Sequence, residues 1–343
     1  MTVERATLPG GYSISRLLMG GWQLAGGHGS VTAAAAHAQM QAYADAGITT
    51  FDCADIYTGV EELIGGFKRL RAAPAVQVHT KCVPDREALG KLRRADIERL
   101  IDRSLARLGV TQLDLVQFHW WDYAMPGCVA AAQWLDELRQ AGKIRLVGVT
   151  NFDTPQLAAL LAAGISVATH QVQYSVLDQR PAAGMTDLCT THGVQLLCYG
   201  ALAGGFLAEK YLGQPAPVEP LENRSLVKYR LIIEEFGGWD MFQNMLQVLR
   251  RIAAKHQSNI SAVAIRHVLD QPQVAGVIVG ARNAQHLPTT LAAMRLRLDA
   301  ADRTEIAAGQ AAASGPGGDT YTLERMPRGP HAAIMRYNIN ATS

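Results

Sequence analysis

Four side chains with the chemistry of proton transfer follow three short apolar segments of this sequence. They are an acid, a phenol, an amine and an imidazole, and they stand at Asp52, Tyr57, Lys81 and His119. The first segment ends in acids, a tyrosine and the turn-forming Thr58-Gly59, as a barrel strand does where it opens into its C-terminal loop. We therefore expect Asp52 and Tyr57 to lie at the mouth of a pocket, outside the packed core.

The four residue types suit the reduction of a carbonyl group by hydride. The developing alkoxide needs a proton, and Tyr57, a phenol with an unperturbed pKa of about 10, can supply it where a cation stabilises the phenolate. We interpret Lys81 as that cation, Asp52 as the group that holds Lys81, and His119 as a hydrogen-bond donor that orients the carbonyl. A single tyrosine or lysine in such a place is usually structural, but their joint occurrence at successive strand ends favours catalysis.

The same residues carry a resemblance to a known family. The segment FDCADIYTGVEELIG (residues 51–65), Lys81 and the step FHW (residues 118–120) resemble the aldo-keto reductases, and the similarity continues along nearly the whole barrel. This resemblance implies an NAD(P)-dependent oxidoreductase that acts on an aldehyde, ketone, sugar lactol or alcohol. It also implies the roles given above for the four residues.

The resemblance further implies a set of cofactor-binding residues. Thr150, Asn151 and Gln171 resemble the residues that bind the carboxamide, since an amide matches a carboxamide donor for acceptor. Asn151 has the alternative role of capping a helix that begins near Pro155. Tyr199 resembles the aromatic residue that stacks on the nicotinamide ring. The other cofactor-binding candidates are Gly21, Trp22, Asp52, Gly200, Leu202, Gly204, Gly280, His286 and Thr290.

Arg282 bears on the choice between the two nicotinamide cofactors. It follows the last predicted strand and precedes a helix whose N-terminus suits a phosphate. A charge-assisted contact from Arg282 to an adenosine 2′-phosphate would favour NADP(H), and NAD(H) stays open. His286, Thr289 and Thr290 depart from the residues that many family members carry on this helix, so the adenine contacts stay open as well.

The substrate-binding candidates are mostly aromatic, and we expect a small carbonyl or alcohol as substrate. The resemblance gives Trp22 a place in the pocket, and the doubled tryptophan after the histidine offers further walls. The candidates are Trp22, Tyr57, His119, Trp120 and Trp121.

Strand-like and helix-like segments alternate along the chain, which predicts parallel strands with crossover helices. We predict a single (β/α)8 barrel domain over residues 1–343, with the barrel at about 12–298 and an extension at 299–343 that folds back over the barrel mouth. Gly10-Gly11-Tyr12 resembles a hairpin turn that closes the bottom, and a long, irregular excursion occupies 202–238. The predicted strands are 14–19, 48–52, 75–81, 113–119, 144–149, 167–172, 194–199 and 274–279.

Composition excludes several other classes of protein. A net charge of +2, from 32 basic and 30 acidic residues, gives no reason to expect nucleic acid or an anionic membrane as a partner. No segment approaches the roughly 18 apolar residues of a membrane span. Five cysteines without C-x-x-C spacing indicate buried thiols in the cytoplasm. The sequence also lacks G-x-G-x-x-G, H-E-x-x-H and G-x-S-x-G motifs, so we expect neither a Rossmann domain nor a metal.

Two further functions stay open at this point. The first is a cofactor-binding regulatory subunit, resembling the potassium-channel β subunits that share this fold, with little turnover. The second is an aldolase on the same barrel that forms a Schiff base through Lys81. The physiological direction, the substrate and the oligomeric state are not readable from the sequence.

Overall fold

Eight parallel strands close into a barrel in the order β10-β3-β4-β5-β6-β7-β8-β9, which confirms the predicted (β/α)8 fold. The computed structural model describes residues 3–25, 32–70, 76–281 and 283–340. The barrel strands are β3 Leu17–Gly20, β4 Thr50–Asp52, β5 Gln77–Cys82, β6 Leu113–Phe118, β7 Ile144–Thr150, β8 Val167–Gln173, β9 Gln195–Tyr199 and β10 Val274–Gly280.

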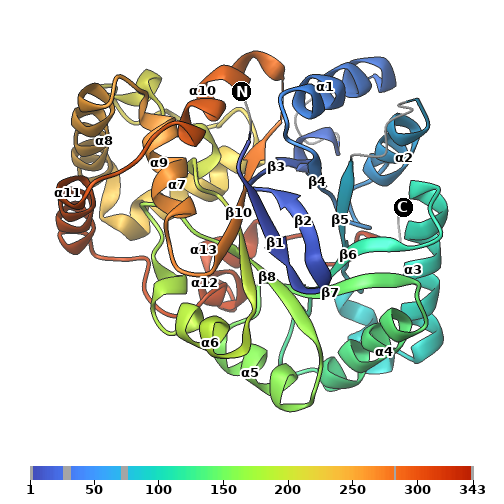
Figure 1. Cartoon of the computed structure of the whole chain (residues 1–343). Helices are drawn as coiled ribbons and strands as arrows, with labels where there is room; N and C mark the ends of the chain where they lie inside the picture. The colour runs from blue at the N-terminus through green and yellow to red at the C-terminus, as the bar shows by residue number, and fades with distance from the viewer. Residues whose placement is uncertain (1–2, 26–31, 71–75, 282, 341–343) are drawn as a thin grey trace.

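Helices surround the barrel (Figure 1). Thr32 caps the first helix by accepting from the amide of Ala35 at 3.2 Å, and Gly109, at φ 65°, ends the third. The helices are α1 Ala33–Asp45, α2 Val60–Leu70, α3 Arg94–Leu108, α4 Cys128–Gln140, α5 Thr154–Ala162, α6 Met185–His192, α7 Arg224–Phe236, α8 Gly238–Lys255, α9 Ile260–Leu269, α10 Leu287–Leu291, α11 Ala300–Ala311, α12 Thr322–Arg325 and α13 Pro330–Ala333.

A hairpin closes one end of the barrel, as the glycine turn predicted. Its strands are β1 Arg5–Leu8 and β2 Tyr12–Ser15, and both Gly10 and Gly11 have the positive φ that this turn needs. Its apolar side chains form a floor with residues of the barrel strands; this cluster comprises Leu8, Tyr12, Ile14, Leu18, Leu115, Leu197 and Ala275.

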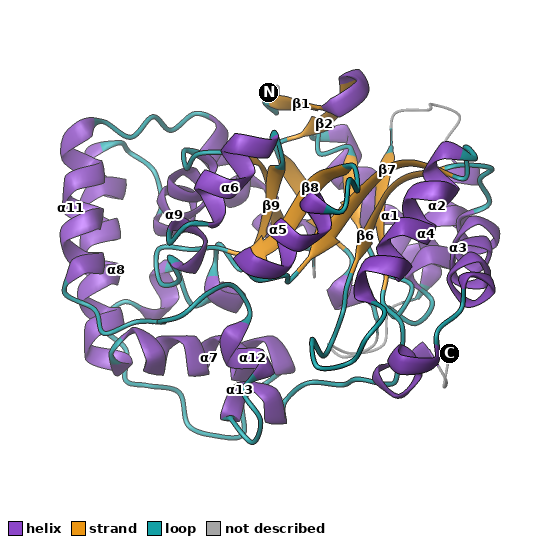
Figure 2. Cartoon of the chain, turned by 90° about the horizontal axis from the view of Figure 1, so that it is seen from below, coloured by secondary structure: helices purple, strands orange, loops and turns teal. Residues whose placement is uncertain are grey.

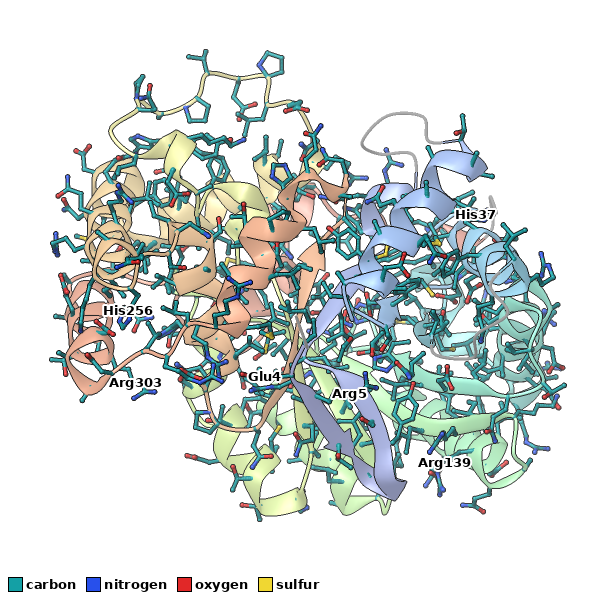
Figure 3. The ribbon with its side chains drawn as sticks, turned by 45° about the horizontal axis from the view of Figure 1, so that its top comes forward. Glu4, Arg5, His37, Arg139, His256 and Arg303 are labelled. Carbon is teal, nitrogen blue, oxygen red and sulfur yellow. The ribbon has the colours of Figure 1, made fainter. Side chains whose placement is uncertain are left out.

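The predicted strand 14–19 is two strands, because the chain turns from the hairpin into the barrel at Arg16. The amide of Arg16 donates to the carbonyl of Glu4 at 2.8 Å, so it pairs with the hairpin side. Its guanidinium pairs with the Glu4 carboxylate at 3.1 Å, and Arg266 pairs with the same carboxylate. Figure 3 places Glu4 at the start of the hairpin, where these ion pairs tie it to α9.

Regular helices occur in the excursion and in the tail, where the sequence pattern predicted none. The predicted excursion 202–238 contains α7, and the tail begins with the regular helix α11, whose first turn is held by a capping box of Asp299 and Asp302. The helix predicted after the last strand is instead broken into the short α10 and flanking 3-10 turns. Figure 2 shows α7, α12 and α13 at the end of the barrel opposite the hairpin.

The tail folds back over the mouth, as predicted. The guanidinium of Arg325 donates to the carbonyl oxygens of Asn151 and Trp120, at 2.7 Å each. Farther on, the amide of Arg86 donates to the carbonyl of Tyr337 at 3.0 Å. Among the described helices, none has both the length and the apolar composition that crossing a lipid bilayer requires.

Candidate active site

The register of the barrel brings the predicted strand ends together. Asp52 on β4 pairs with His79 on β5, and Lys81 on β5 pairs with Gln117 on β6. The amide of His119 then donates to the carbonyl of Cys82 at 3.0 Å. Because parallel strands end at the same rim of a barrel, the acid, the amine and the imidazole lie on three neighbouring strand ends.

Asp52 is the centre of a buried polar network. One of its carboxylate oxygens, Oδ2, accepts from Nζ of Lys81 at 2.7 Å. The other, Oδ1, accepts from the side-chain amides of Gln117 at 3.1 Å and Gln171 at 2.6 Å. Lys81 also donates to the carbonyl of Cys53 at 2.8 Å. With every one of these groups buried, the charges of Asp52 and Lys81 are compensated by each other and by fixed donors and acceptors.

Lys81 lies beside the phenol that it was expected to assist. Its Nζ is 5.2 Å from the centre of the Tyr57 ring. Burial raises the pKa of Tyr57, and the charge of Lys81 opposes this rise. Burial also acts to lower the pKa of Lys81, but Asp52 and Tyr57 outweigh it, so that pKa is raised. Lys81 therefore stays a charged ammonium at neutral pH, which opposes the aldolase function, since a Schiff base forms from the neutral amine.

His119 is held with one ring nitrogen toward the backbone. Its Nδ1 lies 3.0 Å from the carbonyl oxygen of Thr150. Its Nε2 is buried and has no hydrogen-bond partner within the described chain. Burial, followed by the charge of Arg325, lowers the pKa of His119 to about 3. The ring is therefore neutral at pH 7, and because a carbonyl oxygen can only accept, this contact is a hydrogen bond when Nδ1 carries the proton. The role predicted for His119 as a donor to a substrate carbonyl stays a prediction.

The three tryptophans occupy different positions. The ring of Trp22 meets Tyr57 edge-on, with centres 5.1 Å apart, and Trp121 meets His119 in the same way at 4.3 Å. Both therefore lie beside candidate catalytic residues, and their substrate contacts stay predictions. Trp120 is fully buried, packs on Phe118 and donates to the carbonyl of Asp122 at 2.9 Å. Because its ring is fully buried in these contacts, this position does not support its predicted substrate contact.

The carboxamide-binding candidates divide into two groups. Tyr199 donates from its hydroxyl to Oδ1 of Asn151 at 2.8 Å, so these two half-buried residues adjoin at the mouth. Asn151 has the left-handed φ of 62° and does not cap α5, because Asp153 does so by accepting from the amide of Gln156. Gln171 is turned inward instead, with its amide nitrogen donating to Asp52 and to Oε1 of Gln117. Thr150 is buried, and its hydroxyl donates to the backbone carbonyl of Gln171 at 3.2 Å.

The glycines after β9 allow α7 to approach the barrel. A Cβ on Gly200 would lie 2.6 Å from the hydroxyl of Tyr229, and one on Gly204 would lie 2.8 Å from the same ring. Both glycines also have positive φ. Leu202 between them is half-buried against the core. The close packing on Tyr229 explains these positions without a ligand, so their cofactor contacts stay predictions.

The candidates for the adenosine end are spread along the rim. Gly21 donates from its amide to the carbonyl of Asp52 at 2.7 Å, and a Cβ on Gly280 would meet the side chain of Gln23. His286 is exposed and Thr290 is buried. Arg282 lies outside the described residues, so its role remains a prediction.

A second buried charge cluster lies beside Tyr199 and was not foreseen. Arg180 pairs with Asp178 at 2.7 Å and with Glu324 of the tail at 3.4 Å. Lys228 of α7 pairs with Glu324 at 3.5 Å, and its Nζ is 4.9 Å from the centre of the Tyr199 ring. Asp178 and Arg180 are two positions apart, but Lys228 and Glu324 are distant from them in the sequence, so the cluster forms no motif. Gln117 was also missed, although its place two residues before His119 puts it on the same side of the strand.

One cluster has the spacing of metal ligands. His256, Asp299 and Asp302 lie with ligand atoms within 4.8 Å of one another, on the side of the molecule where Figure 3 labels His256 and Arg303. Lys255 pairs with both carboxylates, at 2.6 and 2.8 Å, and His256 contacts Asp302 at 2.7 Å. The described partners account for the cluster as an ion-pair network.

Comparison with known proteins places these features in context. Residues 16–310 match the sequence model of the Aldo/keto reductase family. The chain is 31% identical over 258 residues to flagellar radial spoke protein 5 of Chlamydomonas reinhardtii. This match covers 63% of this chain and 49% of that protein. It thus spans about half the length of that relative. It is 26% identical over 320 residues to the NADH-specific methylglyoxal reductase of Escherichia coli (strain K12), covering 85% of this chain and 93% of that one.

Solved structures agree on the fold. The glycerol dehydrogenase of Gluconobacter oxydans superposes with a TM-score of 0.78 at 24% sequence identity, covering 92% of this chain and 97% of that chain. At this identity the likeness concerns the fold alone.

Proposed function

The chain belongs to the aldo/keto reductase family of nicotinamide-dependent oxidoreductases, and we propose that it transfers hydride between the cofactor and the carbonyl or alcohol carbon of a small molecule, with Tyr57 as general acid and base. The observation that carries this proposal is the buried array of Asp52, Lys81 and Tyr57. In it a charged ammonium, fixed by a carboxylate at 2.7 Å, lies beside a phenol at the barrel mouth.

The groups at the mouth fit a nicotinamide. Asn151 offers an amide, and the neighbouring Tyr199 offers an aromatic ring. Gln171 donates from its amide nitrogen to two buried partners, so it can only accept from a carboxamide, through its Oε1. When bound, the nicotinamide supplies or takes up the hydride. Arg282 would favour NADP(H) over NAD(H) by binding the 2′-phosphate.

Tyr57, Lys81 and Asp52 would together carry out the proton transfer. In the reductive direction the Tyr57 hydroxyl donates its proton to the substrate oxygen as the new C–H bond forms at the carbonyl carbon. Lys81 stabilises the phenolate that remains, and Asp52 with its two glutamine donors keeps Lys81 in place. In the oxidative direction the phenolate takes the proton back from an alcohol. The five free cysteines fit a reducing compartment, and we place the protein in the cytoplasm.

Binding and turnover test this proposal separately. Purified protein is titrated with NADPH and with NADH while tryptophan fluorescence is followed, and loss of NAD(P)H absorbance is then measured with a panel of aldehydes and ketones. Tyr57→Phe should leave cofactor binding intact and lower kcat by a factor on the order of 10² to 10⁴. Tyr211→Phe, which changes a tyrosine packed on Phe206, is the matched control and should retain activity.

The outcomes separate the candidate functions. Full activity in Tyr57→Phe would refute its role as acid and base. Tight cofactor binding without turnover of any substrate would favour the regulatory subunit. Binding of neither cofactor would refute the oxidoreductase function.

A further inference from the structure

The tail returns to the barrel at Arg325, a residue that belongs to no motif of the sequence. Its guanidinium donates to two backbone carbonyl oxygens, those of Asn151 and Trp120, at 2.7 Å each. The guanidinium carbon lies 4.0 Å from the centre of the Tyr123 ring and 5.0 Å from that of Tyr321, so two aromatic rings support the cation. Arg325 therefore fastens α12 to the loops that follow β6 and β7.

Asn151 has a backbone conformation that needs such support. Its φ of 62° lies in the left-handed region, which is unfavourable for residues other than glycine, although less so for asparagine than for most. Its amide donates to the carbonyl of Gln171 on β8 at 3.0 Å, and its carbonyl accepts from Arg325. One backbone group of Asn151 is thus held by the barrel and the other by the tail. A strained residue keeps its conformation only where the surrounding structure imposes it.

The side chain of Asn151 depends on this backbone geometry. Its Oδ1 accepts from the Tyr199 hydroxyl at 2.8 Å, so the N–H groups of the same amide are the ones that could donate to a carboxamide oxygen. The adjacent tail residue, Glu324, supports the other member of this pair. Its fully buried carboxylate pairs at 3.5 Å with Lys228, whose Nζ is 4.9 Å from the centre of the Tyr199 ring. Two adjacent residues of the tail thus reach both groups proposed to hold the nicotinamide.

On the basis of the proposed function, we infer that Arg325 is a positioning residue for the nicotinamide half of the cofactor. It fixes the backbone of Asn151, so the side-chain amide meets the carboxamide without first having to be ordered. Because each event favours the same conformation of Asn151, binding of the nicotinamide and docking of the tail stabilise each other. The adenosine half, which is proposed to bind after β10, gains nothing from this contact.

Two pairs of ligands separate the nicotinamide half from the rest of the cofactor. NADPH is compared with 2′-phospho-ADP-ribose, and NADH with ADP-ribose, since the second member of each pair lacks the nicotinamide. Isothermal titration calorimetry gives Kd for the wild type and for Arg325→Met. We expect Kd for the dinucleotides to rise about tenfold, which corresponds to an ordering cost of about 1.4 kcal/mol, and Kd for the nicotinamide-free ligands to change less than about twofold. Arg328→Met changes an exposed arginine of the same tail and should leave every Kd unchanged.

Amide hydrogen exchange of the wild type tests the reciprocal effect and needs no variant. Saturating NADPH or NADH should slow exchange in peptides that contain α12, whereas the nicotinamide-free ligands should not. If circular dichroism shows that Arg325→Met does not fold, this exchange decides alone.

The possible results separate the inference from the function on which it rests. In a folded Arg325→Met variant, equal losses of affinity for both members of a pair, or no loss at all, would overturn the inference. Exchange in α12 that does not respond to the nicotinamide would overturn it as well. Each of these results leaves the oxidoreductase function standing, whereas absence of binding of all four ligands to the wild type would overturn both.

Discussion

Replacing Lys81 by methionine should destabilise the protein more than replacing any exposed charged residue. The reason is that the substitution leaves the buried carboxylate of Asp52 without its counter-charge. The side chains of Lys81 and Asp52 are 6% and 5% exposed and 2.7 Å apart. Removing one partner of such a pair typically costs about 3–5 kcal/mol of unfolding free energy. Asp52 keeps its two glutamine donors, so we expect the lower end, about 3 kcal/mol.

The reciprocal and double variants isolate the pair. Asp52→Asn leaves the ammonium with the carbonyl of Cys53 as its remaining acceptor, and it should also cost about 3 kcal/mol. The double variant removes both charges, so no buried ion is left without its counter-charge. We expect the unfolding free energy of the double variant to be about 3 kcal/mol lower than that of the wild type. This loss is about 3 kcal/mol smaller than the sum of the losses in the two single variants.

The assay is urea unfolding at pH 7, followed by circular dichroism and tryptophan fluorescence. Because the folded-state pKa of Lys81 is raised, its contribution to stability is fully present below the unfolded pKa of about 10.4 and is lost only as pH rises through the folded value. The control is Arg99→Met, which removes an ion pair with Asp96 whose arginine is 72% exposed and should change stability by less than about 1 kcal/mol. Additive single costs would refute the account of Asp52 and Lys81 as one coupled unit.

Three further predictions concern other parts of the chain. Burial, reinforced by Glu61, raises the pKa of Asp55 to about 8, so the folded state binds more protons than the unfolded one and stability falls as pH rises from about 4 to about 8. Asp55→Asn should flatten the pH dependence of the urea midpoint in that range, and an unchanged slope would contradict this. Arg282→Ala should weaken NADPH binding but not NADH binding in fluorescence titrations; equal losses would refute a 2′-phosphate contact. Arg325→Met removes the guanidinium that donates to the carbonyl oxygens of Asn151 and Trp120 and so weakens the attachment of the tail. Trypsin should then cleave the tail faster than in the wild type, and an unchanged rate would contradict that role.

The catalytic candidates were predictable because their signal is local. Each of Asp52, Lys81 and His119 stands at the end of a short apolar segment, and barrel topology then brings the ends of neighbouring strands together. The caps at Thr32 and Gly109 were readable for the same reason, since a cap depends on residues within one turn of the helix. Gln117 had a local signal in the two-residue period of a strand, but a buried glutamine is usually structural.

The helices and the individual contacts of the tail and the excursion were not predictable, because these contacts join residues far apart in the sequence. Glu324 pairs with Arg180 and Lys228, and no spacing in the sequence links the three. The break at Arg16 also depends on partners at the other end of the chain, since its guanidinium donates to the carbonyl of Val274 at 2.9 Å. The contact of His119 with the backbone carbonyl of Thr150 is of the same kind, since residue type does not reveal it.

The network around Asp52 gives different surroundings to Asn151 and Gln171, the two amide residues predicted to bind the cofactor. Gln171 was expected to share the carboxamide with Asn151, yet its amide nitrogen donates to Asp52 and Gln117. Only Asn151 has its side chain at the mouth beside Tyr199. Gln171 therefore connects β8 to the carboxylate that positions Lys81. A change in the orientation of Gln171 would move the Oε1 atom proposed to accept from the cofactor, and it would also weaken the network that holds Lys81 beside Tyr57. The residues proposed for cofactor binding and those proposed for proton transfer are thus joined through a single buried carboxylate oxygen, Oδ1 of Asp52.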